Sequence, residues 1–392
     1  MTPSRFQIKW LWLVAATVIT ASPFSGAAQT NNATAKTAAQ EKTEAELRAV
    51  FENSFSRWDR NGDGVLVLTE INALIENPEV RGDEAAAIVV VRQHFAPKGE
   101  ASGFTGLTRE QLLSFAGDAD AARKFVQLRK RMQTINHELF LPGDPNLETF
   151  HQGGTGDCYL LSVIGTLLNR DPARVRDMIH AMPGDAYRVH FGDGRMENVL
   201  PLTDAELVMG ARAGTDHGVW LSVLEKAYAS IREENRDQRA GKFMAEDEAI
   251  DRDLLGGGGT GPIIELLTGH KAASAPVGKW IKENPGQAEK RLHDLLIKLT
   301  KEHKLMAVGT GKGDKPLPKH IAHSHAFGIF GYDAATHTVR LFNPWGNDVK
   351  PDDPPGLVNG YATRNGVFEM PLRDFMQVFG GVNYETSKPV QH

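Results

Sequence analysis

Residues 151–169 read HQGGTGDCYLLSVIGTLLN. A glycine-rich loop runs here into an apolar series with helical spacing, so Cys158 is predicted to begin a helix. Free N–H groups and the dipole at a helix start lower the pKa of a thiol. Gln152 carries an amide that can donate to an oxygen developing negative charge. A lone cysteine before an apolar helix is by default a buried small hydrophobe, so a nucleophile needs further support.

That support lies downstream, where a base and an orienting group follow along the chain. Residues 323–333 read HSHAFGIFGYD, and residues 339–347 read VRLFNPWGN, which places Asn343 at the end of a strand-like run. A histidine can take the thiol proton, and Asn343 can hold the imidazole in one tautomer. Trp345 can cover that hydrogen bond from water. Cysteine, histidine and asparagine in this order are typical of a cysteine protease.

In these motifs the chain resembles the calpains, a family of papain-like cysteine endopeptidases. Six segments carry the resemblance in family order: QGGTGDCY (152–159), VWLSVLEKAYA (219–229), LLGGGGTGPIIELLTG (254–269), SHAF (324–327), NPWG (343–346) and GVFEMPLRDFMQVF (366–379). Tyr159 replaces the tryptophan of the family. The family's GHAYS-like stretch selects His325 rather than His323 as the base.

The resemblance implies an α+β fold with a papain-like, two-lobed catalytic core over residues 139–392. The helical lobe would be 139–269 and carry the cysteine. The β-rich lobe would be 270–392 and carry the histidine and asparagine, with the substrate in the cleft between the lobes.

The resemblance also implies hydrolysis of peptide bonds in proteins or peptides through a thioester acyl-enzyme. Cys158 would be the nucleophile and His325 the base. Asn343 would orient the imidazole, and Gln152 would donate to the oxyanion.

A second motif lies near the start of the chain, where residues 59–70 read DRNGDGVLVLTE. This segment fits the EF-hand calcium loop D-x-[DN]-x-[DN]-G-x₅-E at every position. The predicted ligands are the side chains of Asp59, Asn61, Asp63 and Glu70 and the backbone carbonyl of Val65. Hard oxygen ligands in this number suit Ca²⁺. The alternative is an acidic, glycine-containing turn that binds nothing.

The calcium loop is expected to pair with a second loop that has lost its ligands. Helices are predicted over 83–95 and 107–115, and the amphipathic helix 45–58 precedes the first loop. If Leu107 takes the place of Leu66, the ligand positions fall on Glu100, Ser102, Phe104 and Gln111. Residues 44–118 are therefore interpreted as a small all-α EF-hand pair with one Ca²⁺ site.

Two departures from the calpain pattern argue against further calcium sites in the core. The resemblance implies an acid three residues before the oxyanion glutamine and another before the EKAY stretch. Thr149 and Gly218 stand at these positions.

The remaining N-terminal segments are interpreted from composition. Residues 1–28 form a secretory signal, so export to the periplasm or the medium is expected. Their apolar run is shorter than a bilayer span requires, which disfavours a membrane anchor. Residues 29–43 lack aromatic side chains and are predicted to be a disordered linker. Residues 119–138 are predicted to be a connector helix.

Composition excludes several classes of protein. With 44 Lys and Arg against 49 Asp and Glu, the net charge of −5 argues against binding to nucleic acid. One cysteine in 392 residues excludes an intramolecular disulfide. The hypotheses are an exported, monomeric calcium-binding endopeptidase and, as the alternative, a catalytically silent calcium-responsive binding protein. The intact cysteine, histidine, asparagine and glutamine favour the first.

Overall fold

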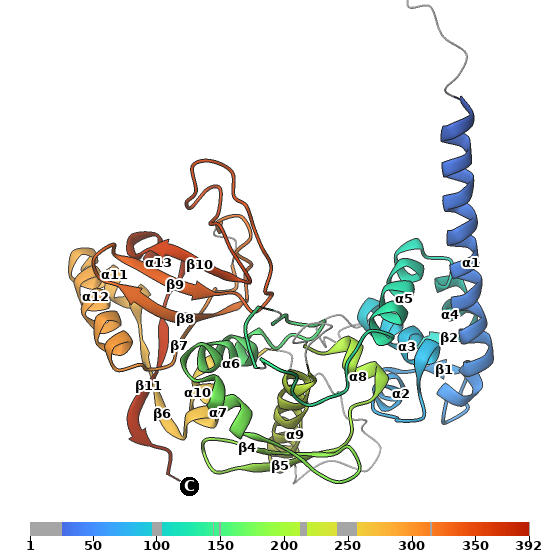
Figure 1. Cartoon of the computed structure of the whole chain (residues 1–392), viewed down its shortest axis with the longest axis horizontal. Helices are drawn as coiled ribbons and strands as arrows, with labels where there is room; N and C mark the ends of the chain where they lie inside the picture. Colours follow the sequence, from blue (N-terminus) through green and yellow to red (C-terminus); the bar gives the residue numbers. More distant parts are fainter. Residues whose placement is uncertain are drawn as a thin grey trace, which may run out of the picture.

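The computed structural model describes residues 26–95, 104–143, 145–148, 150–211, 218–240, 257–313 and 316–391. Residues 1–25 of the predicted signal peptide lie outside the described part of the chain. The described chain forms an N-terminal helical unit, a helical lobe and a β-rich lobe, which follow one another across Figure 1. None of the helices within the described ranges is both long enough and apolar enough to cross a bilayer.

The N-terminal unit contains two helix–strand–helix segments. Its elements are α1 (Gly26–Trp58), β1 (Val65–Leu66), α2 (Leu68–Ile75), α3 (Gly82–Phe95), β2 (Leu107–Thr108), α4 (Arg109–Phe115) and α5 (Ala119–Met132). The two short strands pair antiparallel, with Leu66 opposite Leu107. Both leucines are buried in one apolar cluster with Phe51 and Trp58. The register expected from the sequence is therefore present.

Two N-terminal segments differ from expectation. Residues 29–43 belong to α1, which runs as one continuous helix from Gly26 and projects beyond the rest of the unit (Figure 1). Alanine is the strongest helix former, which favours extension of the amphipathic helix through this stretch. Residues 119–132 form α5, whose Phe125 and Leu128 are buried in the N-terminal core. This helix is thus part of the unit and does not stand apart as a connector.

The helical lobe surrounds one buried helix. Its elements are α6 (Cys158–Arg170), α7 (Pro172–Asp177), β3 (Ile179–Ala181), β4 (Tyr187–His190), β5 (Met196–Val199), α8 (Asp204–Met209), α9 (Trp220–Ala240) and α10 (Thr260–Thr268). Strands β3, β4 and β5 form a three-stranded sheet in that order. Residues 159–168 of α6 are all buried, so this helix is covered on every side.

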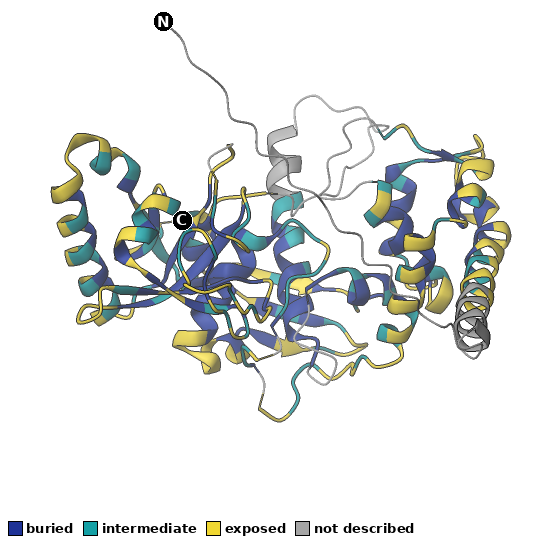
Figure 2. Ribbon diagram, turned by 90° about the horizontal axis from the view of Figure 1, so that it is seen from above, coloured by how far each residue is buried: buried dark blue, intermediate teal, exposed yellow. Residues whose placement is uncertain are grey.

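The β-rich lobe is a six-stranded antiparallel sheet in the order β10-β9-β8-β7-β11-β6. Its elements are β6 (His270–Ala275), α11 (Val277–Glu283), α12 (Pro285–Lys301), β7 (Met306–Gly309), β8 (Ala326–Asp333), β9 (Thr338–Phe342), β10 (Val367–Pro371), α13 (Leu372–Val378) and β11 (Val382–Pro389). The outer helices keep exposed faces, whereas the strands β7, β8 and β9 are largely buried (Figure 2).

Strand β8 contacts both lobes, because successive side chains along it point to opposite faces of the sheet. Phe327 and Ile329 pack into the core of the β-rich lobe, and Ala326 packs into the core of the helical lobe. Two glycines allow α6 to approach this sheet closely. A Cβ atom at Gly328 would lie 2.4 Å from Thr166 Oγ1, and one at Gly165 would lie 2.2 Å from the ring of Phe342. The start of α6 is thereby fixed beside the start of β8.

The N-terminal unit is docked on α8 of the helical lobe. The hydroxyl of Thr203, which caps α8, donates to the carbonyl of Ile75 at 2.5 Å. Arg131 donates to the carbonyls of Leu207 and Val208 at 2.8 and 2.7 Å. Ala205 and Val208 are buried in the N-terminal cluster. Packing is therefore continuous from the N-terminal unit into the helical lobe.

Candidate active site

Cys158 is the first residue of α6, as the sequence predicts, but its environment differs from expectation. The carbonyl of Asp157 accepts the N–H groups of Leu160 and Leu161 at 2.8 and 3.1 Å, which begins the helix. Burial raises the pKa of the Cys158 thiol. Backbone N–H groups, including that of Ala326, oppose this shift without reversing it. The expected low-pKa thiolate is thus wrong for this structure, because desolvation outweighs the helix start.

His325 and Asn343 are held together in the β-rich lobe. His325 directly precedes β8 and Asn343 directly follows β9, and their side chains meet with Nε2 of the ring 2.9 Å from Oδ1 of the amide. Because an amide oxygen only accepts, Nε2 carries the proton and Nδ1 is left as the basic nitrogen. Burial lowers the pKa of His325, which the bond to Asn343 partly offsets. The imidazole is therefore neutral at pH 7.

Neighbouring groups fix the orientation of this imidazole. The Trp345 ring lies over it with a centroid distance of 4.4 Å, and Phe327 meets it edge-on at 4.9 Å. Thr310 Oγ1 accepts the backbone N–H of His325 at 3.0 Å. His323 is exposed. Of the two histidines, His325 is the one held beside Asn343.

The loop before Cys158 meets the loop after Asn343, which brings the two predicted halves of the site together. The backbone N–H of Gln152 donates to the carbonyl of Pro344 at 2.8 Å. His151 Nδ1 lies 3.0 Å from the carbonyl oxygen of Trp345. A Cβ atom at Gly346 would lie 2.0 Å from a backbone oxygen, so only glycine fits there. The Cys158 sulfur faces the backbone N–H of Ala326, the residue after His325. Cys158, His325 and Asn343 therefore lie at one junction between the lobes.

Gln152 is placed on this junction, but its amide is directed into its own loop. Its Nε2 donates to the carbonyl of Thr155 at 2.7 Å and to Asp157 Oδ1 at 3.0 Å. Both N–H bonds of the amide are then used, because a side-chain amide has two. In this arrangement Gln152 has no N–H left for an oxyanion. The amide must turn before it can act in that role.

Tyr159, which replaces the family's tryptophan, is buried with its hydroxyl satisfied. Arg232 of α9 donates to this hydroxyl and, at 2.8 Å, to the carbonyl of Gly257. The ring of Tyr228 meets it edge-on. Buried tyrosines require such a partner. The substitution is therefore accommodated by polar groups from α9.

Sequence reasoning missed a buried pair of carboxyl groups beside the cysteine. Asp157 and Glu225, from α9, are 0% and 6% exposed and are in hydrogen-bond contact. Both acids stand in segments that the sequence analysis singled out, Asp157 directly before Cys158 and Glu225 within 219–229. Neither segment by itself indicates that the two side chains meet.

The predicted calcium loop joins α1 to α2 and carries two acids at its ends and one exposed acid, Asp63. Asp59 and Glu70 are nearly buried. Asp59 accepts the N–H groups of Gly62 and Gly64 at 2.9 and 2.8 Å, and Glu70 accepts that of Arg60 at 2.8 Å. Within the described residues, no group of three or more Asp, Glu, His or Cys side chains is arranged to hold a metal ion. The structure therefore shows the loop but not a calcium site.

The loop nevertheless has oxygen ligands that fit a hard cation. Asn61 Oδ1 accepts the N–H of Asp63, and Asp63 Oδ1 accepts that of Val65, which orders the alternate ligand positions. Gly64 adopts a φ of +82° at the sharp turn that the motif assigns to glycine. All five predicted ligands are oxygens, as Ca²⁺ prefers.

Gly218 stands where the calpain pattern has an acid, and the structure leaves no room for a side chain there. A Cβ atom at Gly218 would lie 2.2 Å from the carbonyl oxygen of Leu139. The next two residues, Val219 and Trp220, donate to the carbonyls of Glu138 and Leu139. Close backbone packing thus accounts for glycine at this position. Thr149, the other departure, lies outside the described residues.

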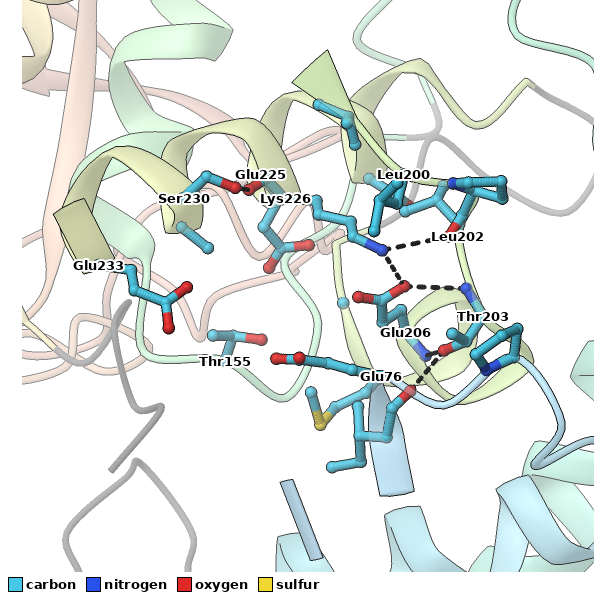
Figure 3. A pocket seen from close by; sticks show the side chains of 18 of the residues that line it. Glu76, Thr155, Leu200, Leu202, Thr203, Glu206, Glu225, Lys226, Ser230 and Glu233 are labelled. Carbon is cyan, nitrogen blue, oxygen red and sulfur yellow. Dashed lines mark hydrogen bonds and ion pairs between the residues drawn. The ribbon is translucent and has the colours of Figure 1, made fainter. Parts of the chain in front are cut away.

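The structure also contains a cavity of about 580 Å³ away from this junction (Figure 3). It lies between α2, β5, α8 and α9, and Glu225 and Thr155 form part of its wall. None of Cys158, His325 and Asn343 is among the described residues that line it. The cavity is therefore not the predicted substrate cleft.

The protein thus has two lobes, and a cysteine, a histidine and an asparagine, as in thiol proteases, lie at the junction between them. A model of calpain family cysteine proteases matches residues 108–351, well over half of the chain. The chain belongs to the calpain family of cysteine proteases.

Curated relatives are similar over the same region. The calpain-1 catalytic subunits of Homo sapiens and Mus musculus are 22% identical over 291 residues, which cover 65% of this chain and 37% of theirs. A calpain-type cysteine protease of Oryza sativa subsp. japonica is 23% identical over 284 residues, which cover 65% of this chain and 12% of that protein. The chain thus spans little more than a third of the calpain-1 relatives it matches.

Proposed function

We propose that this protein is an endopeptidase that hydrolyses peptide bonds through a thioester on Cys158. The observation that carries the proposal is the buried bond between His325 and Asn343, covered by Trp345, at the point where the helix-start cysteine meets β8. This bond holds the imidazole in one tautomer with its basic nitrogen available.

The raised pKa of the thiol and the lowered pKa of His325 set the order of proton transfer. The resting pair is neutral, so the imidazole takes the thiol proton as the sulfur attacks the carbonyl carbon. The same nitrogen then protonates the leaving amine, and water hydrolyses the thioester. The backbone N–H of Cys158 is the first donor for the oxyanion. Gln152 becomes the second when its amide turns from Thr155 and Asp157.

The alternative is a protease fold that binds protein without turnover. An electrophilic peptide, such as a peptidyl vinyl sulfone, distinguishes the two because it labels only a cysteine that is activated as a nucleophile. We expect labelling of the mature protein at Cys158 and none in His325→Ala. Labelling at equal rates in both proteins would contradict the proposed base.

The N-terminal unit is proposed to bind one Ca²⁺ through the oxygens of Asp59, Asn61, Asp63 and Glu70 and the carbonyl of Val65. The donor set and the turn at Gly64 support this proposal. A bound cation would supply charge that gathers the loop oxygens and stabilises the helices on either side. Export through the signal at residues 1–28 is proposed with it, because an exported protein meets abundant calcium. Secretion of a reporter fused after residue 28, compared with the same fusion lacking residues 1–28, tests the export.

A further inference from the structure

The carboxyl groups of Asp157 and Glu225 lie in the interior, directly behind the loop that joins Gln152 to Cys158. Asp157 occupies the cap position of α6, where an aspartate usually accepts an N–H of its own helix. Here its side chain makes no such bond. Its Oδ1 instead accepts from Gln152, at 3.0 Å. Asp157 is completely buried, which is rare for an acid without a cationic partner.

Glu225 reaches the same point from α9. Its Oε2 accepts the backbone N–H of Ala211 at 2.7 Å, and a Cβ atom at Gly210 would lie 2.4 Å from that oxygen. The glycine thus allows the backbone to approach the carboxylate. Figure 3 shows Glu225 directed from α9 toward the loop that carries Thr155, whose hydroxyl is a further donor to it.

One oxygen of each acid lacks a donor. Among the described residues, Asp157 Oδ2 and Glu225 Oε1 have no hydrogen-bond donor, although the two side chains contact each other. Two ionised carboxylates in contact in this buried site would repel each other, and one oxygen of each would remain without a donor. A single proton between these two oxygens satisfies both.

We propose that Asp157 is a neutral carboxylic acid that donates its proton to the Glu225 carboxylate, and that this bond positions the loop carrying Gln152 and Cys158. The distribution of donors assigns the proton. Glu225 is stabilised as the anion by the N–H of Ala211 and the hydroxyl of Thr155, whereas Asp157 receives the amide of Gln152 and its own backbone N–H. Asp157 is thus a positioning residue.

The electrostatic surroundings support this assignment. Burial, and then the charge of Glu225, raise the pKa of Asp157 well above its usual range. Burial also raises the pKa of Glu225, but its hydrogen bonds and the charge of Arg131 oppose the shift. Arg131 and the Cys158 thiol are the charged and titratable groups that face the pair from α5 and α6. A neutral Asp157 places no negative charge beside the thiol at neutral pH.

Infrared spectroscopy of the whole protein at pH 7 tests the protonation state without reference to activity. Exposed acids are ionised at this pH, so the C=O stretching band of a neutral carboxylic acid should come from this pair. We expect this band in the wild type, its loss in Asp157→Asn, and its retention in the matched exposed control Asp333→Asn. A wild type without the band, or Asp157→Asn with it, would overturn the proposal.

The positioning role rests on the proposed protease function and is measured by rescue. Asp157→Ala should lower peptide hydrolysis at least tenfold, because the loop loses its bond to α9. Asp157→Asn reproduces the neutral acid, with its amide donating to Glu225 and its oxygen accepting from Gln152, and should restore most of that loss. Equal loss in both variants, with native circular dichroism, would overturn the role. If the wild type cleaves no peptide, the infrared result still decides the protonation state.

Discussion

Cys158 is the residue on which the proposed chemistry depends, and its substitution gives the first prediction. Cys158→Ala should abolish peptide hydrolysis and leave the melting temperature within a few degrees of the wild type, because the side chain is only partly buried and little apolar surface is lost. Hydrolysis assays and differential scanning calorimetry check both parts. Hydrolysis at the wild-type rate by this variant would contradict the assignment of the nucleophile.

The contact between His325 and Asn343 predicts unequal effects of removing each partner. Asn343→Ala should reduce kcat/KM less than His325→Ala, because the asparagine only orients a ring that Trp345 also holds, whereas the histidine moves the proton. Measurements on one peptide substrate suffice. Equal losses would mean that orientation and proton transfer cannot be separated in this site.

The pKa shifts of the pair predict how thiol reactivity depends on pH. Because burial raises the pKa of Cys158, the thiolate fraction at pH 7 is small and increases only above the pKa of a free thiol. Alkylation by iodoacetamide should therefore increase at a higher pH than that of glutathione under the same conditions. A rate already maximal at pH 6 would instead indicate a preformed thiolate–imidazolium pair.

At the scale of elements, the contact of α6 with the sheet determines where the nucleophile stands. Gly165→Ala would place a methyl group against the ring of Phe342 and should destabilise the protein by about 1–3 kcal/mol. Gly286→Ala is the matched control in α12, since a Cβ atom there meets nothing closer than 3.8 Å. Denaturant unfolding of both variants measures the difference. Similar stabilities would show that the α6 contact has room to adjust.

The loop between α1 and α2 carries the calcium prediction. Glu70→Ala should abolish Ca²⁺ binding in calorimetric titration and lower the melting temperature of the N-terminal unit in calcium-containing buffer. Glu52→Ala, an exposed position on α1, is the control and should bind calcium normally. Binding that survives in Glu70→Ala would place the ion elsewhere.

At the scale of the whole molecule, the N-terminal unit covers one face of α8. A chain that begins at Leu139 would expose Ala205 and Val208 and remove the carbonyl of Ile75 from the Thr203 hydroxyl, so it should melt below the full chain. It should nevertheless cleave peptides without added calcium, because the predicted calcium ligands lie in the removed unit. Two bound calcium ions and activation on binding, measured on this shorter chain, would show that the core keeps metal sites despite Gly218.

The sequence by itself was enough to recognise the family, and it predicted several of the elements. The motifs around Cys158, His325 and Asn343 lie within short segments, so their recognition needs no knowledge of packing. Apolar spacing over residues 45–58 and 107–115 predicted the second half of α1 and α4, because both patterns express the burial of one local face.

Tertiary structure alone decided the properties that depend on burial and on distant partners. It raises the pKa of the Cys158 thiol by burial and places α5 inside the N-terminal core. It also joins Asp157 to Glu225, which are separated along the chain by about half of the helical lobe. Local sequence could not show these features, because desolvation and the sharing of a proton arise only when separate elements exclude water from a common interior.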